Sequence, residues 1–394
     1  MKTQGKIFLL VLWMFIVAHP CVKAQENDNK IVEIINKLYE KYEKHQTIEY
    51  KEINYSENGL SDTINSYFEK KPLDARIGLW FEAVDKSSKV IYNTSDLFVI
   101  GLTNSSFYLP KNEYEKYPIT HPFQPIKGYA NSYPAYVKAL KTILTDTNIK
   151  KSLLDDTIIN NHNCYQFSFH FENGRIMGDT LYAFPKGVTI SFDFTFFIDM
   201  DNYLLRQIIF SNSMGSQSTT QYIDYVFDTP KSNILWTLSD YKNLKEYERY
   251  EYKLISEGTK MPDFNAETLE KTKIDLSYFE GKVSLLFFLN VDCGAAKMTI
   301  GAVNNLTKKY SEITAIGIDN EDDDIDQINQ YREKEKIDFK IAIGSKDVAK
   351  TFGVNSWPTI LIFDKANILR YVYNGYYDEL EPDIEKNIKK LTEE

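Results

Sequence analysis

The sequence of 394 residues is poor in cysteine and in positive charge. Three cysteines are too few for the disulfide framework that stabilises many small secreted domains. The 46 lysines and arginines are outnumbered by 56 aspartates and glutamates, which gives a formal net charge of −10. Because no basic stripe is present to meet phosphates, we expect no nucleic-acid partner. An apolar fraction of 43% with 26% charged residues indicates a folded protein, long enough for two domains.

Long apolar runs are also missing, except at the N-terminus. Two lysines precede the apolar run Ile7–Ala18, and Val22-Lys23-Ala24 has the small-residue pattern of a signal-peptidase site. We therefore predict a signal peptide over residues 1–24 and cleavage before Gln25. The mature chain then has no apolar run of transmembrane length, and the protein is expected to be exported, either periplasmic or secreted.

Cys21 offers a second interpretation of the N-terminus, a lipoprotein anchor. Pro20 directly before this cysteine does not fit the pattern of a lipidated cysteine, so plain secretion is the favoured interpretation. In either case only Cys164 and Cys293 remain as protein thiols in the folded part of the chain.

Residues 25–230 combine helical and strand patterns and are predicted to form an α+β domain rich in antiparallel strands. The expected helices cover 29–44 and 134–145, and the expected strands cover 47–55, 75–84, 90–92, 96–102, 163–172, 188–198, 203–211 and 221–227. This order predicts a strongly curved antiparallel sheet wrapped over helices. It resembles the half-barrel of LolA-like outer-membrane lipoprotein carriers, most closely in the stretch FFIDMDNYLLRQIIF, residues 196–210.

Aromatic residues alternate along two of these strands, and their role has two interpretations. Phe167, Phe169, Phe194 and Phe196 line a concavity that holds a lipid or an apolar peptide, or they are covered by the helices of the domain itself. Core packing is the more common fate of such side chains.

Residues 231–257 are polar and aromatic and are predicted as a linker to a second domain over 258–394. The central feature of that domain is the apolar run Val283–Leu289, which suits a buried parallel strand and is followed by Cys293 at the mouth of a helix. Further helices are expected over 300–310, 324–335, 347–352 and 377–391, and further strands over 313–319, 339–343, 360–363 and 368–373. The alternation indicates an α/β fold.

The stretch GKVSLLFFLNVDCGAA, Gly281–Ala296, resembles the string G-K-V-x-L-L-x-F-W-A-x-W-C-x-x-C of TlpA/ResA-type disulfide reductases. Met261-Pro262-Asp263-Phe264 resembles the A-P-D-F start of the same thioredoxin-like (redoxin) domains. The resemblance covers nearly all of 258–391 and implies a thioredoxin-like fold with Cys293 as the nucleophile. A cysteine at a helix N-terminus is stabilised as the thiolate by the helix dipole.

The C-x-x-C motif is degenerate, because Ala296 stands where the second cysteine belongs. Without a second thiol, the dithiol cycle in which one cysteine resolves the mixed disulfide of the other is absent from this motif. Lys297, one turn along the helix, is a candidate for supporting the Cys293 thiolate, whereas Asp292 directly before the cysteine would oppose it. Cys164 is the one remaining candidate for a distant resolving partner, although a lone cysteine on an aromatic strand is more often a small buried hydrophobe.

Pro358 matches the cis-proline loop that faces the active cysteine in thioredoxin-like folds. The resemblance implies that Trp357 and Thr359 beside it contribute to substrate binding. Peroxide reduction is disfavoured, because Leu286 and Asn290 occupy the positions of the proline and threonine that peroxiredoxins place before their cysteine. The acidic run 321–324 lacks the ligand spacing of a calcium loop, so we expect neither a metal nor a cofactor.

Two functions remain open from the sequence. In the first, the protein is a monothiol thiol–disulfide oxidoreductase in which Cys293 forms mixed disulfides with a thiol- or disulfide-containing protein or peptide. In the second, it is a non-catalytic periplasmic binding or scaffold module, in which the degenerate redoxin domain is an interaction surface and the β-domain takes a lipid or peptide.

Overall fold

The computed structural model describes residues 26–56, 61–71, 77–101, 106–110, 128–146, 148–241, 244–246, 253–291, 293–319, 325–343 and 346–393. The predicted signal peptide with Cys21, the residue Asp292 and the acidic run 321–324 lie outside the described residues. Contacts divide the chain into two compact units, Met1–Phe184 with Ile190–Glu248 and Pro185–Thr189 with Arg249–Glu394. No helix in the described ranges combines the length and the apolar character needed to cross a membrane.

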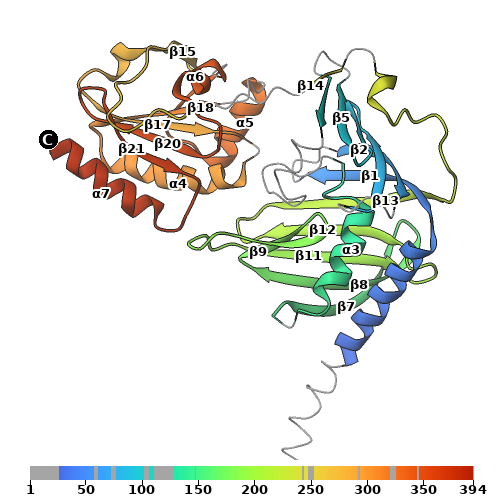
Figure 1. Cartoon of the computed structure of the whole chain (residues 1–394). Coiled ribbons are helices and arrows are strands. Elements are labelled where there is room, and N and C mark those ends of the chain that lie inside the picture. Colours follow the sequence, from blue (N-terminus) through green and yellow to red (C-terminus); the bar gives the residue numbers. More distant parts are fainter. Residues whose placement is uncertain are drawn as a thin grey trace, which may run out of the picture. The chain divides into compact units, whose positions relative to one another are not determined.

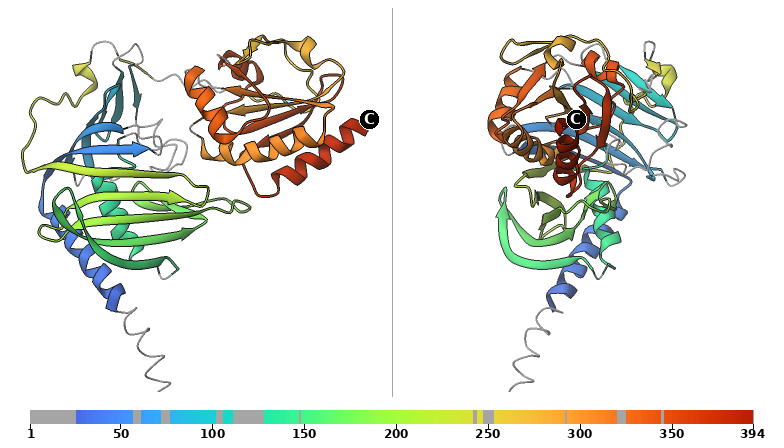
Figure 2. Two further views of the ribbon diagram at one scale, coloured as in Figure 1. Left: turned by 180° about the vertical axis from the view of Figure 1, so that it is seen from behind. Right: turned by 90° about the vertical axis from the view of Figure 1, so that its left-hand side faces the viewer.

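The first unit is built on one strongly curved sheet of twelve strands in the order β14-β6-β5-β4-β3-β2-β1-β13-β12-β11-β8-β7 (Figures 1 and 2). Every neighbouring pair is antiparallel except β14 with β6. The strands are β1 (Thr47–Ser56), β2 (Ser61–Lys70), β3 (Leu79–Val84), β4 (Ser88–Tyr92), β5 (Asp96–Gly101), β6 (Phe107–Pro110), β7 (Lys150–Ile159), β8 (His162–Glu172), β11 (Ser191–Asp199), β12 (Leu205–Asn212), β13 (Gln217–Phe227) and β14 (Lys245–Glu246). A separate hairpin joins β9 (Gly174–Met177) to β10 (Thr180–Ala183). The expected curved antiparallel α+β architecture is confirmed.

Two helices accompany this sheet. The first covers residues 26–44 and buries the apolar stripe that the sequence predicts, Ile31, Ile34, Ile35, Leu38 and Tyr42. The second, α3 (Tyr133–Ile143), starts where Ser132 accepts a hydrogen bond from the N–H of Ala135 at 3.3 Å, with a proline in the first turn. With this cap and proline, α3 starts at Tyr133, one residue before the start expected from the sequence.

The aromatic strands form the core beneath α3, which corrects the interpretation of an open apolar concavity. Phe167, Phe169, Phe194 and Phe196 are at most 1% exposed, and the ring of Tyr136 on α3 packs against Phe194 and Phe196 at 6.4 and 6.0 Å between centroids. The protein's own helix therefore fills the space that a lipid or apolar peptide would need there. We call this side of the sheet the inner face.

A buried carboxylate interrupts the inner face. Glu52 on β1 is 4% exposed, and burial, opposed by the hydrogen bond from Asn54, raises its pKa to about 7 from an ordinary 4.5. An unfolded chain ionises this group at lower pH than the folded chain does. The folded protein therefore loses stability as pH rises from about 4.5 to 7, and the loss of about 3 kcal/mol is complete above that range.

Glu52→Gln keeps the shape of the side chain and removes its charge. We expect this variant to match the wild type in free energy of unfolding at about pH 4 and to exceed it by about 3 kcal/mol at about pH 8. Urea denaturation at both pH values measures the difference. The matched control is Glu49→Gln on the same strand, whose partly exposed carboxylate pairs with Lys231, and it should not show this gain. An equal gain at both pH values would contradict the assignment.

The segment expected as a linker, 231–257, is in part packed on the first unit. Ile234 is buried, and Trp236, Leu238, Tyr241 and Leu244 pack with it in a cluster that contains Tyr67, Ile91 and Phe98 of the sheet. The segment also holds the 3₁₀ turn η1 (Leu238–Asp240) and strand β14. The division between the units accordingly falls at 248/249, later in the chain than the expected end of the first domain.

The second unit has a seven-stranded sheet in the order β16-β15-β19-β18-β17-β20-β21, with β17, β18 and β19 parallel (Figure 1). Its elements are β15 (Ala266–Thr268), β16 (Lys273–Ile274), η2 (Leu276–Phe279), β17 (Val283–Leu289), α4 (Gly294–Lys309), β18 (Ile313–Asp319), α5 (Ile325–Glu335), β19 (Lys340–Ile343), α6 (Lys346–Phe352), β20 (Thr359–Phe363), β21 (Leu369–Asn374) and α7 (Leu380–Glu393). This is the thioredoxin-like α/β fold that the sequence predicts.

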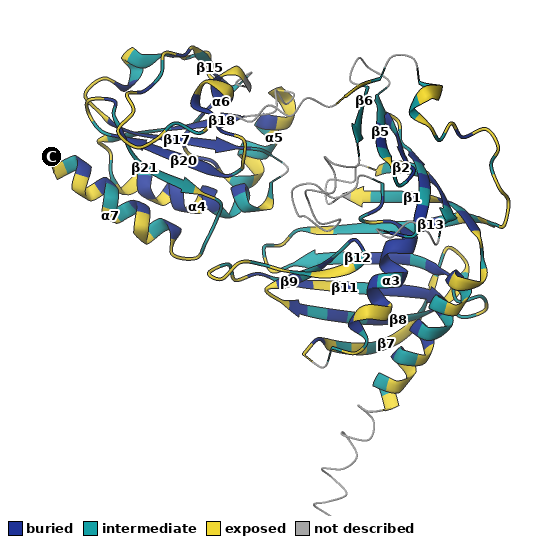
Figure 3. Ribbon diagram, viewed as in Figure 1, coloured by how far each residue is buried: buried dark blue, intermediate teal, exposed yellow. Residues whose placement is uncertain are grey.

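Strand β17 is buried along its whole length (Figure 3). Leu285, Phe287 and Leu289 point to a core shared with α4 and α7, whereas Leu286 and Phe288 point to a second core that includes residues of α6. Two apolar faces on one strand explain why its sequence is continuously apolar instead of alternating. The strand thereby fixes the position of the residues that follow it.

Candidate functional site

Cys293 lies where the buried strand β17 passes into α4. Its backbone N–H donates to the carbonyl of Asn290 at 3.0 Å, and its own carbonyl accepts the N–H of Lys297 at 3.1 Å. The cysteine is the N-cap residue of α4, with extended backbone angles of φ −88° and ψ 110°. The first N–H groups of a helix have no partner within the helix, so the cysteine stands at the positive end of the helix dipole.

The Cys293 thiol faces the loop before β20. Its Sγ atom lies 3.6 Å from the carbonyl oxygen of Trp357, to which the thiol donates. The Trp357–Pro358 peptide bond is cis, and the carbonyl of Pro358 accepts the N–H of Gly375 at 2.7 Å. The cysteine is partly exposed, while Pro358 is buried. Residues far apart in the chain thus form one site around a single sulfur.

Thr359 holds the loop before β20 in place through hydrogen bonds of its side chain. Its side chain is 1% exposed, and the hydroxyl lies 2.8 Å from the carbonyl of Ser356 and 3.0 Å from Oδ1 of Asn374. These contacts tie the loop to β21. The hydroxyl of Thr359 is therefore engaged within the protein, whereas Trp357 remains partly exposed.

Lys297 is one turn along α4 from the cysteine, and its charge is matched elsewhere. Its Nζ atom lies 3.2 Å from Oε1 of Glu335 on α5, and the two side chains are 23% and 13% exposed. Such a shielded ion pair holds the ammonium group toward α5. To support the Cys293 thiolate, as the sequence suggested, Lys297 would have to leave its ion pair with Glu335.

Ala296 occupies the third position of α4 and is fully buried. It packs in the core that also contains Leu289, Ile300 and Ile360, and Cys293 packs against the edge of that core. The methyl group of Ala296 lies on the same side of the first helical turn as the cysteine, because residues three apart on a helix are neighbours. The motif therefore holds one sulfur, that of Cys293, and no second thiol.

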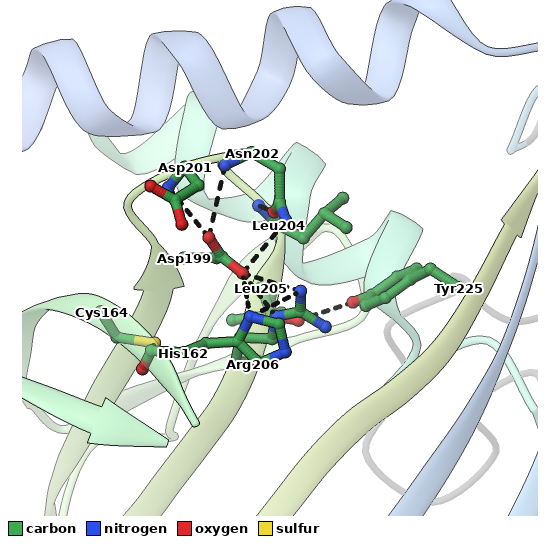
Figure 4. A network of polar contacts seen from close by, with 9 residues as sticks. All are labelled: His162, Cys164, Asp199, Asp201, Asn202, Leu204, Leu205, Arg206 and Tyr225. Carbon is green, nitrogen blue, oxygen red and sulfur yellow. Dashed lines mark hydrogen bonds and ion pairs between the residues drawn. The ribbon is translucent and has the colours of Figure 1, made fainter. Parts of the chain in front are cut away.

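Cys164, the other described thiol, is fully buried on β8 and is a free cysteine. Its Sγ donates to the carbonyl of His162 at 3.4 Å, beside the buried carboxylate of Asp199 (Figure 4). Burial and the charge of Asp199 raise the pKa of Cys164 to about 11. A buried thiol with a raised pKa is a poor nucleophile, so Cys164 does not suit the role of a resolving partner.

Arg206 and His162 fix Asp199 in this network. Arg206 donates to Oδ2 of Asp199 from Nε at 3.0 Å and from Nη2 at 2.7 Å, and Nδ1 of His162 lies 2.9 Å from the same oxygen. Burial by itself would raise the pKa of Asp199, but Arg206 and the backbone N–H groups of the turn hold it below its ordinary value. The network closes the turn between β11 and β12 (Figure 4), so it serves the fold of the first unit.

The burial of the two cysteines predicts selective labelling. In the folded protein we expect iodoacetamide to modify Cys293 readily. We expect it to modify Cys164 on the order of a hundredfold more slowly, because the reagent reaches this thiol only when the surrounding structure opens locally. Mass spectrometry of tryptic peptides measures both sites in one sample. In denaturant the two sites should react at similar rates. Comparable labelling of both cysteines in the native protein would contradict the described geometry.

Three residues of the site carry too little sequence signal to be identified in advance. The backbone carbonyl of Asn290, three residues before the cysteine, accepts its N–H, and a contact to a backbone carbonyl does not depend on the side chain. Glu335 and Asn374 reach Lys297 and Thr359 from distant elements, and nothing in their local sequence indicates these contacts.

Residues 258–372 match the sequence model of the AhpC/TSA family. The C-terminal region is therefore a redoxin domain with a thioredoxin-like fold. The thioredoxin-like protein YneN of Bacillus subtilis (strain 168) is 26% identical over 147 residues, which is 36% of this chain and 86% of that protein. The thiol-disulfide oxidoreductase ResA of Bacillus thuringiensis subsp. konkukian is 28% identical over 138 residues, which is 34% of this chain and 78% of that protein. The C-terminal region is thus similar to thioredoxin-like thiol–disulfide oxidoreductases.

Similar folds also occur among solved structures. A thiol:disulfide interchange protein DsbE from Chlorobium tepidum covers 35% of this chain and 99% of its own, with 20% sequence identity and a TM-score of 0.33. A protein disulfide isomerase from Bacteroides thetaiotaomicron covers 36% of this chain and 92% of its own, with 18% identity and a TM-score of 0.33.

Proposed function

The C-terminal region is a redoxin domain similar to ResA, and on this premise we propose a function for the whole protein. We propose that it is an exported monothiol thiol–disulfide oxidoreductase that acts through Cys293. The observation that carries the proposal is the position of the Cys293 sulfur: partly exposed, at the N-terminus of α4, and 3.6 Å from the carbonyl of Trp357 in the cis-proline loop. Export is supported by the apolar run and cleavage pattern within residues 1–24.

The chemistry needs one protein sulfur and two external partners. The Cys293 thiolate attacks a disulfide R–S–S–R′, forms the mixed disulfide Cys293–S–S–R and releases R′–S⁻. An external thiolate R″–S⁻ then attacks the sulfur of R, forms R–S–S–R″ and returns the Cys293 thiolate. The sum is an exchange between a disulfide and a thiol, so no net electrons stay on the protein. Ala296 supplies no sulfur that could release R within the motif.

The loop around Pro358 and the partly exposed Trp357 is proposed to hold the partner, a thiol- or disulfide-containing protein or peptide. The carbonyl of Trp357 already accepts the Cys293 thiol, so it lies beside the reacting sulfur. Thr359 contributes by fixing the loop, since its hydroxyl bonds within the protein. Peroxide reduction is not proposed, because Leu286 and Asn290 stand where peroxiredoxins have a proline and a threonine before their cysteine.

Exposure to glutathione disulfide tests the proposal. We expect one glutathionyl group per chain, located on the peptide that contains Cys293 and removed by added thiol. Peptide mapping under non-reducing conditions measures the site. Absence of any adduct on Cys293 would favour the alternative, a non-catalytic binding or scaffold module. That alternative is supported by the pairing of Lys297 with Glu335, which leaves the thiolate without a cationic neighbour from this side chain.

A further inference from the structure

An ion pair between α4 and α5 starts one helical turn from Cys293. The backbone N–H of Lys297 donates to the carbonyl of Cys293 at 3.1 Å, as in a turn of helix. Residues four apart on a helix are neighbours, and helical side chains lean toward the N-terminus of their helix. Because Cys293 is the N-cap residue of α4, a lysine at position 297 is placed to bring its ammonium group to the sulfur.

Glu335, the last residue of α5, holds this ammonium group toward α5. Its Oε1 lies 3.2 Å from Nζ of Lys297, and both side chains are mostly shielded from water. The pair of Lys308 with Asp338, which also links α4 to the chain around α5, is by contrast 67% and 46% exposed. Water and salt screen a shielded pair less than an exposed one, so the Lys297–Glu335 pair is the firmer of the two.

The Cys293 sulfur meets a neutral group in the described structure. Its Sγ atom lies 3.6 Å from the carbonyl oxygen of Trp357, which accepts a hydrogen bond from the thiol. A thiolate has no proton to donate to that oxygen, so this contact belongs to the protonated form. An ammonium group at the sulfur would instead attract the thiolate, which is the form that reacts. The single charge of Lys297 can thus pair with Glu335 or with the thiolate.

We propose that Glu335 is a positioning residue that restrains Cys293 by keeping Lys297 in this ion pair. The inference rests on the proposed function, since it concerns the reactivity of the same sulfur in disulfide exchange. Glu335 acts through Lys297 and makes no bond with the reacting atoms. When the carboxylate is replaced by a neutral group, a shielded lysine without a counter-ion is costly, and the Cys293 thiolate one turn away becomes a partner for it.

The expected gain in rate is set by two opposing effects. An opposite charge beside an ionisable group favours its charged form by about one order of magnitude or more, so the thiolate fraction at neutral pH rises about tenfold. The stabilised thiolate is a weaker nucleophile, with a Brønsted coefficient of about 0.5, which cancels about half of that gain on a logarithmic scale. Release of Lys297 should therefore speed the reaction of Cys293 about threefold.

Alkylation of the full chain by iodoacetamide at neutral pH tests the proposal, with Cys293 followed by mass spectrometry of tryptic peptides. The reagent is uncharged, so its rate reports the state of the sulfur and not attraction of the reagent by Lys297. We expect Glu335→Gln to react about threefold faster than the wild type, with the profile of rate against pH moved to lower pH. The gain should shrink in concentrated salt, which screens the new attraction.

Lys297→Met separates a charge effect from a loosened helix. If Glu335 acts through Lys297, adding Glu335→Gln to Lys297→Met brings no gain in rate over Lys297→Met alone. A gain of similar size with and without the lysine would mean that the substitution only exposes the thiol, and it would overturn the proposal. So would an unchanged rate and pH profile in Glu335→Gln.

Glu270→Gln is the matched control for the lost charge and for α5. Glu270 pairs with Arg332 on the same helix, so this variant loses one carboxylate and one ion pair while Lys297 keeps Glu335. It should react at the wild-type rate, and a gain equal to that of Glu335→Gln would also contradict the proposal. Failure of the proposed function looks different, because the wild type would then form no glutathionyl adduct on Cys293.

Discussion

Cys293→Ser is expected to abolish every mixed disulfide that the folded protein forms and every cycle of thiol–disulfide exchange that it supports. The reason is valence: an oxygen in place of sulfur cannot form a disulfide, and the other described thiol is fully buried. The expected change is complete, from one adduct per chain to none. Non-reducing electrophoresis and intact mass after exposure to glutathione disulfide measure it.

The matched control is Cys164→Ala. Cys164 is a small buried side chain on β8, so its replacement should leave adduct formation at Cys293 at the wild-type rate, with at most a modest decrease in stability. If Cys293→Ser still formed an adduct, the reactive sulfur would be elsewhere. If Cys164→Ala lost the adduct, the two cysteines would act together, and the single-sulfur account would be wrong.

Ala296→Cys is expected to restore a dithiol cycle. Positions 293 and 296 lie at the N-cap and third residue of α4. Residues three apart on a helix have Cβ atoms about 5–6 Å apart, so a disulfide, whose Cβ atoms are about 3.5–4.5 Å apart, needs a small local adjustment. The new thiol can attack the mixed disulfide on Cys293 and release the partner. We expect the rate of disulfide reduction with excess dithiothreitol to rise on the order of tenfold or more.

Ala296→Ser separates chemistry from packing in this test. Position 296 is fully buried in the core beside Leu289 and Ile300, so an added atom strains its neighbours in either variant. The serine variant should share any loss of stability and gain no turnover. Equal activity of the serine and cysteine variants would show that the missing second thiol is not what limits the wild type. Peptide mapping of the oxidised Ala296→Cys variant should show a disulfide between Cys293 and the introduced cysteine.

The core of the redoxin domain was predictable because its signals are local. A continuous apolar strand, a cysteine at the following helix and a proline before the next strand are all readable in sequence, and β17, Cys293 and Pro358 occupy the expected places. The partners of the neighbouring side chains were not predictable. Lys297 pairs with Glu335 and Thr359 with Asn374 because the fold brings distant elements together, which no short pattern records.

Six strands of the first unit were not expected from the sequence, namely β2, β6, β7, β9, β10 and β14. For β2 and β7 there is a physical reason. Strand β2 (Ser61–Lys70) carries Asp62, Ile64 and Ser66 toward the inner face, so its sequence lacks the apolar alternation of a half-buried strand. Strand β7 (Lys150–Ile159) lies at the edge of the sheet and contains two lysines and two aspartates, which are typical of edges that avoid further pairing.

The charged residues of the inner face were invisible for a related reason. Glu52 and Arg175 are isolated charges in strands, where such residues usually face water. Only the fold buries Glu52 on β1 and places the guanidinium group of Arg175 over the rings of Phe192 and Phe210. A polar position in a strand is thus ambiguous until the fold is known.

The most direct test of the central claim is the fate of one mixed disulfide in the absence of free thiol. Wild-type protein carrying a single glutathionyl group on Cys293 is freed of excess reagent, and intact mass is followed over time. A protein with one reactive sulfur keeps the group until an external thiol is added, then loses it at once. Spontaneous release of glutathione with formation of a disulfide between Cys164 and Cys293 would contradict the account.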